Sequence, residues 1–191
     1  MSHSIFALEL CVRLDETGLL HKQLRQALPL QLTRMSAGQK WQQYHQATQL
    51  LLRNIGAAEL GCWDYFEDEE RARNDFDMWT KGMTTAEGAR SESRLLVAGE
   101  PRYLTFTMAF LIVKDSPSDL ALRRTCNIKE THLWRRDVFA HLLKNFGVVS
   151  FASVYRDVSY IIPRDPEWSL TREDLTAKKF EYLRRIVDKQ R

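Results

Sequence analysis

The histidines of this chain are the side chains best suited to catalysis or metal binding, yet their spacing forms no known motif. They stand at His3, His21, His45, His132 and His141. None lies in an HExxH sequence, and none has a second ligand type at metal-binding spacing. His132 and His141 are nine residues apart on one predicted helix, so they point to opposite sides of it. We therefore predict no metal, no cofactor and no catalytic residue, and keep His132 only as a candidate binding residue.

Other sequence motifs that carry chemistry are also absent. The chain has eight glycines, and they form neither a phosphate-binding loop nor the turn that exposes a nucleophilic serine. The acidic run 67–70 lacks the spacing of a calcium-binding loop, so we interpret it as the solvated start of a helix. The three cysteines form no CxxC pair, and an odd number of cysteines suits a reducing compartment.

Paired arginines are the next candidates, because they could bind an acidic partner. The two pairs of interest are Arg123–Arg124 and Arg135–Arg136. If they joined in one basic patch, nucleic acid would be a candidate partner. The formal net charge is only +3, from 28 basic and 25 acidic residues, which argues against nucleic acid. Charges that flank an amphipathic helix are the preferred interpretation of both pairs.

A binding site could still be assembled from residues that are distant in sequence. The candidate binding residues are Arg135, Arg136, Arg156 and His132. A deep pocket that gathers Arg156, Asp157, His132 or Glu9 would indicate a small-molecule-binding protein or an enzyme. A flat, exposed apolar patch would instead indicate a protein-interaction module.

Two periodicities predict the elements that would position these residues. Apolar residues alternate with a period of two in four segments, which predicts strands over 4–14, 59–66, 102–114 and 148–162. Spacing of three and four predicts helices over 17–28, 37–55, 68–81, 129–145 and 169–189. Ser36 is the expected N-cap of the second helix. We expect a loop or broken helix over 82–99, and at most one helical turn after 115.

These elements predict a single α+β domain over residues 1–191. We expect a four-stranded, mainly antiparallel sheet with about five helices packed chiefly on one face. The strand at 102–113 is apolar on both faces toward its end, which predicts a central position in the sheet. At 191 residues the chain is long enough to bury a core without disulfides or metal.

Two C-terminal segments carry a resemblance to a known family. RYLTFTMAFLIV at 102–113 resembles its "YxxVTLLVAA" strand, and VSYIIPRDPEWSLTREDL at 158–175 resembles its closing strand and "LTEDEL" helix start. The family is an uncharacterised one from cyanobacteria and plastids, a domain of unknown function numbered fifteen-seventeen. Ile161, Ile162 and Pro163 replace its aromatic–Thr–Pro, and the glycine-rich region and membrane segment that usually precede the domain are missing. The resemblance implies a fold, and no activity or catalytic residue.

The functional expectation is consequently broad. No stretch is long and apolar enough for a membrane span, and the first residues lack the basic region of a signal peptide, so we predict a cytoplasmic protein without membrane contact. The leading hypothesis is a non-enzymatic protein-interaction module, with self-association as a homodimer. The alternative is a small-molecule-binding protein, or an enzyme whose site is assembled from scattered residues.

Overall fold

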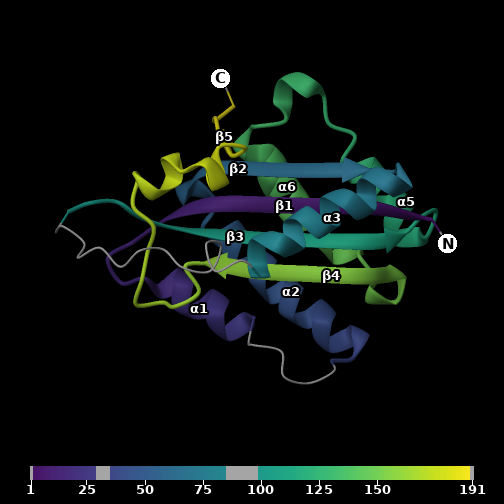
Figure 1. The fold of residues 1–191 in the computed structure, drawn as a ribbon, viewed down its shortest axis with the longest axis horizontal. Helices are drawn as coiled ribbons and strands as arrows, with labels where there is room; N and C mark the ends of the chain where they lie inside the picture. The colour runs from purple at the N-terminus through teal and green to yellow at the C-terminus, as the bar shows by residue number, and fades with distance from the viewer. Residues whose placement is uncertain (1, 29–34, 85–98, 190–191) are drawn as a thin grey trace.

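The computed structural model describes residues 2–28, 35–84 and 99–189, and in them a five-stranded antiparallel sheet. The strand order is β4-β3-β1-β2-β5 (Figure 1). The strands are β1 (His3–Leu14), β2 (Ala58–Phe66), β3 (Arg102–Val113), β4 (Val154–Ile162) and β5 (Arg184–Arg185). The α+β class is confirmed, and so is the central position of 102–113. The expectation of four strands is corrected to five, because β5 pairs with β2 at Leu60 and Gly61.

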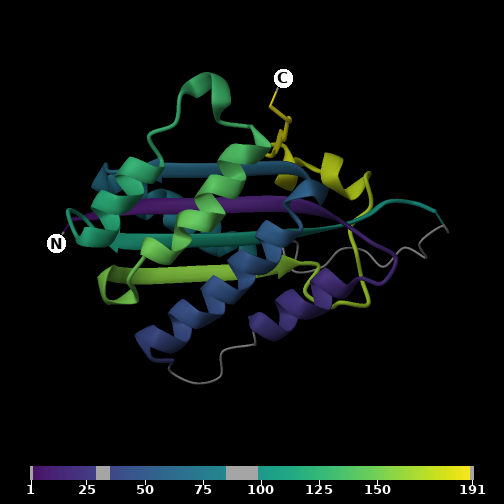
Figure 2. The same ribbon diagram turned by 180° about the vertical axis from the view of Figure 1, so that it is seen from behind.

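Four helices cover one face of the sheet, which we call the helical face (Figure 2). They are α1 (Leu19–Ala27), α2 (Ala37–Arg53), α5 (Pro117–Thr125) and α6 (Arg136–Asn145). The even-numbered residues of β1, from Phe6 to Val12, pack against them in the largest core cluster. A capping box between Ser36 and Gln39 starts α2 and confirms the expected cap.

The other face, which we call the second face, carries α3 (Glu69–Thr84) and the C-terminal segment 163–189 (Figure 1). Ala72 and Phe76 of α3 pack on Ile5 and Ala7 of β1. Most of the loop expected over 82–99 falls on 85–98, which is outside the described residues, while α3 itself continues through Thr84.

The predicted C-terminal helix over 169–189 is wrong. Its place is taken by two short 3-10 turns, Asp174–Thr176 and Lys178–Phe180, followed by β5. The backbone of this segment makes short-range turn hydrogen bonds, and it also bonds to the strands of the sheet. Leu170 exchanges both backbone hydrogen bonds with Tyr103, at 2.8 and 2.9 Å, and Ile186 N–H donates to the carbonyl of Glu59 at 2.9 Å. The apolar residues of this segment recur at helical spacing because they pack against the sheet, although the segment does not form a long helix.

Three smaller differences have local causes. The segment after 115 forms a nine-residue helix, because Ser116 caps it and Pro117 occupies the first turn. The helix expected over 129–145 begins only at Arg136, since the extended backbone of Arg135 precedes it. The strand expected from 148 begins at Val154, after two 3-10 turns.

Within the described ranges, no helix has the length and apolar character needed to cross a membrane.

Candidate functional site

A row of polar side chains crosses the second face of the sheet. Glu9 of β1 lies opposite Cys62 of β2 and Thr107 of β3, and Thr107 lies opposite Tyr160 of β4. Because side chains alternate along a strand, Glu9 shares this face of β1 with His3, Ile5, Ala7, Cys11 and Arg13. The strand alternation therefore places one carboxyl group in the middle of the strand, between the side chains of Ala7 and Cys11.

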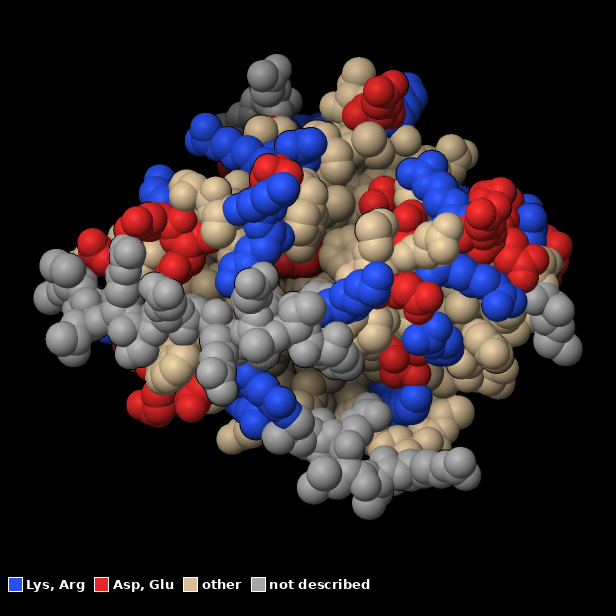
Figure 3. Space-filling view, viewed as in Figure 1, with Lys and Arg blue, Asp and Glu red and all other residues tan. Residues whose placement is uncertain are grey.

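Two aromatic side chains from other elements lie on the same side of the sheet. Trp79 of α3 meets Tyr182 of the C-terminal segment with ring centroids 5.9 Å apart and ring planes at 85°. Tyr182 also contacts the row directly, because its hydroxyl donates a 2.8 Å hydrogen bond to Oε2 of Glu9. Figure 3 shows that this face of the molecule is hollowed near its middle, with acidic and basic side chains around the hollow. We call Glu9, Thr105, Thr107, Tyr160 and Tyr182 the Glu9 cluster.

Three oxygens of the Glu9 cluster are buried and have no partner within residues 2–28, 35–84 and 99–189. Glu9 is 1% exposed, and its Oε1 has no hydrogen bond in the described part of the chain. The hydroxyls of Thr105 and Thr107 are also buried, and neither has a hydrogen-bond partner among the described residues. They are near enough to Glu9 to favour its charged form, but their geometry falls short of a hydrogen bond. Each buried polar atom left unpaired costs about 1–3 kcal/mol, so the cluster is a costly arrangement for a structural core.

Burial also changes the acidity of the cluster. It raises the pKa of Glu9 from 4.5 to about 7, although the hydroxyls of Tyr182, Thr107 and Thr105 oppose the shift. Burial raises the pKa of Cys62 to about 12 and also raises that of Tyr160 above its usual value. Asp64, which lies opposite Ala7 on β2, has its pKa raised to about 6 by burial and by the nearby charge of Asp75. Two carboxyl groups of this face thus change charge near neutral pH.

The residues that sequence analysis offered for a shared pocket lie apart. Arg156 faces α3, where it bonds Asp77 at 3.0 Å and lies over the ring of Phe76. Asp157, the next residue, faces the opposite side and bonds Lys40 and Tyr44 of α2. His132 lies in a 3-10 turn between α5 and α6. Of the four residues considered for a shared pocket, Glu9 alone belongs to the Glu9 cluster.

The arginine pairs are engaged in the fold. Arg136 donates from Nη1 to the carbonyls of Ile55 and Ala58, at 2.7 and 2.6 Å, and from Nε to Asp188 at 2.6 Å. Arg135 forms an ion pair with Asp137. These contacts give both residues structural partners.

Arg123 is likewise held by acidic neighbours. It pairs with Glu67, Asp115 and the buried Asp119. A phosphate group could reach Arg123 or Arg136 only by displacing a carboxylate, which weakens the case for a nucleic-acid surface.

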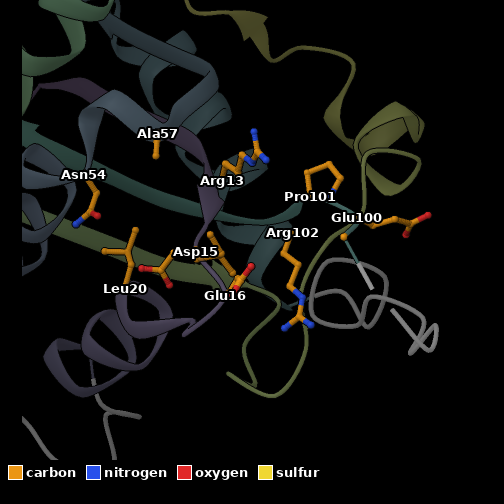
Figure 4. A pocket seen from close by; sticks show the side chains of 11 residues that line it. Arg13, Asp15, Glu16, Leu20, Asn54, Ala57, Glu100, Pro101 and Arg102 are labelled. Carbon is orange, nitrogen blue, oxygen red and sulfur yellow. The ribbon is translucent and has the colours of Figure 1, made fainter. Parts of the chain in front are cut away.

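A second concave region is an open groove at the ends of β1 and β3, with a volume of about 710 Å³ (Figure 4). Its lining mixes charges, including Arg13, Glu16 and Arg102. The carboxylate of Asp15 is occupied by its own turn, where it accepts from Thr17 and Gly18. Among the described lining residues of the groove, none has a buried polar atom without a partner. The Glu9 cluster is therefore the better candidate site.

No group of three histidine, cysteine or acidic residues in the described ranges could hold a metal ion. The chemistry available at the Glu9 cluster is hydrogen bonding, aromatic contact and the gain or loss of one proton at Glu9.

Sequence analysis named Glu9 but missed its neighbours. Thr105 and Thr107 lie on the face of β3 shared with Tyr103, and Tyr160 and Tyr182 come from later segments. One signal was available: a single acid on an apolar strand face, together with two threonines on another predicted strand. The pairing register that brings them together was not visible in the sequence.

Comparisons with known proteins add no relative. No family model matches the chain. No curated protein and no solved structure matches it either.

Proposed function

We propose that the protein binds a small molecule at the Glu9 cluster, on the second face of the sheet. The observation that carries this proposal is the buried carboxylate oxygen of Glu9, which, like two nearby threonine hydroxyls, has no hydrogen-bond partner among the residues that the structure describes. This is the alternative function of the sequence analysis, with a different set of residues.

The physical reason is the cost of these unpaired atoms. A ligand that offers polar hydrogens to them would supply the hydrogen bonds that these atoms lack within the described chain. The rings of Trp79 and Tyr182 would contact its apolar part, as binding sites commonly combine apolar walls with a few polar groups. A group of this kind also suits proton transfer, because a carboxyl with a pKa of about 7 is half protonated near neutral pH.

The test is a fragment screen followed by protein NMR. We expect the bound fragments to shift the amide signals of Glu9, Thr107 and Tyr160 together. Thr107→Val, which removes one hydroxyl and keeps the side-chain shape, should weaken these fragments. Thr176→Val is the matched control, because its hydroxyl bonds the carbonyl of Glu173 in an exposed turn. Fragments that bind only elsewhere, or an unchanged affinity in Thr107→Val, would overturn the proposal.

A protein-interaction role is our second proposal, and the observation that favours it is the edge strand β4. Tyr155 on this strand is 61% exposed, and its ring lies 4.5 Å from that of His3. The strand pairs with β3 on one side and has no strand partner on the other within the described residues. Such an edge can add a strand from a second chain. Light scattering would test this: a monomer at all concentrations, unchanged in Tyr155→Ala, would refute self-association.

The cytoplasmic location is part of the same proposal. All three cysteines are free, and Cys11 is buried against Tyr103 and Leu170. Free thiols suit a reducing compartment.

A further inference from the structure

The Glu9 cluster has a preference for one chemical class of ligand. This inference rests on the proposed function and deepens it. We infer that the ligand carries an ammonium or comparable N–H cation, which lies against Oε1 of Glu9 and the hydroxyls of Thr105 and Thr107, beside the rings of Trp79 and Tyr182.

The first argument is the number and type of unpaired atoms. An ionised carboxylate oxygen can only accept hydrogen bonds, and a threonine hydroxyl has two acceptor lone pairs. Oε1 of Glu9 and the two hydroxyl oxygens therefore offer three acceptors with no partner in the described ranges. A primary ammonium group has three N–H donors, so it can satisfy all three.

The second argument is the charge around Glu9. The groups that act on its acidity within the described ranges are the hydroxyls of Tyr182, Thr107 and Thr105, and no basic side chain is among them. Asp64 adds another acidic group one row away. Two basic residues of this face act on other groups: Arg184 acts on Cys62, and Arg71 lies 3.6 Å from Asp75. A buried charge without a counter-ion favours a cation and disfavours an anion.

The third argument is the aromatic contact. The electron-rich face of an aromatic ring attracts a cation, and tryptophan is the strongest of the three aromatic residues in this respect. Trp79 meets Tyr182 edge to face, and the hydroxyl of Tyr182 bonds Glu9, so Trp79 adds a second ring to the aromatic contact of the cluster. Tyr182 additionally keeps its hydroxyl on Oε2 of Glu9, which leaves Oε1 for the ligand.

Binding of a cation has a defined effect on protons. The cation stabilises the charged form of Glu9, so a protonated Glu9 must release its proton to solvent when the ligand binds. The other titratable groups that face it are Cys11, Cys62, Tyr160 and Tyr182, and burial raises the pKa of each, so they stay neutral. Asp64 loses its proton at a lower pH than Glu9, because its pKa is raised only to about 6. Affinity should therefore increase from pH 5.5 to 7 and level off above 8.

The experiment compares three probes with one skeleton: 2-phenylethylamine, 2-phenylethanol and 3-phenylpropionate. Binding is measured by NMR titration of the whole chain at pH 5.5, 7 and 8.5. We expect the amine to bind about tenfold more tightly at pH 8.5 than at pH 5.5. Glu9→Gln should weaken the amine about tenfold and leave the alcohol unchanged. Glu59→Gln, which changes a half-exposed acid near Tyr103, is the matched control.

The outcomes separate the two proposals. If the alcohol or the carboxylate shifts the Glu9 cluster more strongly than the amine, the cation inference fails and the binding site stands. If no probe shifts the amide signals of the cluster but uncharged fragments do, the cation inference also fails and the binding site stands. If neither the probes nor a fragment library reaches the cluster, both proposals fail. Thr107→Val provides a second variant should Glu9→Gln fail to fold, and it should weaken the amine more than the alcohol.

Discussion

The hydroxyl of Tyr182 donates a 2.8 Å hydrogen bond to the carboxylate of Glu9, across 173 residues of sequence. This bond joins the C-terminal segment to the middle of β1, a central strand of the sheet. It also satisfies one oxygen of a carboxylate whose other oxygen has no partner in the described part of the chain. The same contact thus contributes to the fold and shapes the candidate site.

The first prediction concerns stability and pH. Glu9 has a pKa of about 7 when folded against 4.5 normally, so the folded chain binds this proton more tightly than the unfolded chain does. The free energy of unfolding should consequently fall as pH rises from about 4.5 through 7. Glu9→Gln removes this dependence. Its stability relative to the wild type should increase by roughly 2 kcal/mol between pH 5 and pH 8. Urea unfolding at several pH values measures this difference.

A difference that stays constant from pH 5 to pH 8 would contradict the raised pKa. Asp64→Asn is the variant to compare with Glu9→Gln, because the pKa of Asp64 is also raised, to about 6. Its relative stability should rise over a lower pH range than that of Glu9→Gln.

The second prediction is that Tyr182→Phe raises the pKa of Glu9 above its already raised value. The Tyr182 hydroxyl favours the charged form of Glu9, so its loss favours the neutral form. We also expect a loss of about 1–3 kcal/mol at pH 8, where Oε2 would be buried without a donor. The carboxyl ¹³C shift of Glu9 reports the pKa directly. Tyr155→Phe, on the exposed edge strand, should change neither quantity.

The third prediction contrasts two neighbouring arginines. Arg136→Ala removes the guanidinium that donates to the carbonyls of Ile55 and Ala58, and it breaks the ion pair with Asp188. We expect a loss of about 2–4 kcal/mol. Arg135→Ala removes an ion pair with the half-exposed Asp137 and should cost less than about 1 kcal/mol. Equal losses in urea unfolding would show that Arg136 does not anchor this corner of the fold.

The fourth prediction concerns the close approach of β2 to α6. A Cβ added at Gly61 would lie 2.8 Å from ring atoms of Phe139 and 3.1 Å from the carbonyl of Glu9. Phe139 is fully buried, so its ring cannot move aside cheaply. Gly61→Ala should therefore destabilise the protein by about 1–3 kcal/mol. Gly56→Ala meets no atom within 4 Å and should be neutral or slightly stabilising. The denaturant midpoints of the two variants measure this difference in stability.

Local signals predicted the elements that depend on local physics. Strict alternation predicted β1 and β3, because both strands use side-chain direction to separate two cores. The Ser36 cap and the spacing after it predicted α2. The predicted four-stranded sheet lacks β5, a strand of two residues that no periodicity can reveal, and its last strand begins at 148 instead of Val154.

Long-range contacts account for what sequence could not predict. Leu170, Phe180 and Leu183 are buried as a helix stripe would be, but they pack beside Cys11 and Tyr103 from an irregular backbone. The Glu9 cluster depends in the same way on strand register. Glu9 and Thr107 are neighbours only because β1 and β3 pair in one particular register.

The position of β5 has a consequence for synthesis of the protein on the ribosome. β1 and β2 are made early and can pair with each other, but the outer edge of β2 receives its partner only when Arg184–Arg185 has been translated. The backbone N–H of Arg136 receives the carbonyl of Val187 later still. Until then the nascent chain exposes an unpaired β2 edge and an uncovered Glu9 row. Chains with such distant pairings fold slowly, so we expect this one to need chaperone protection until residue 187 has left the ribosome.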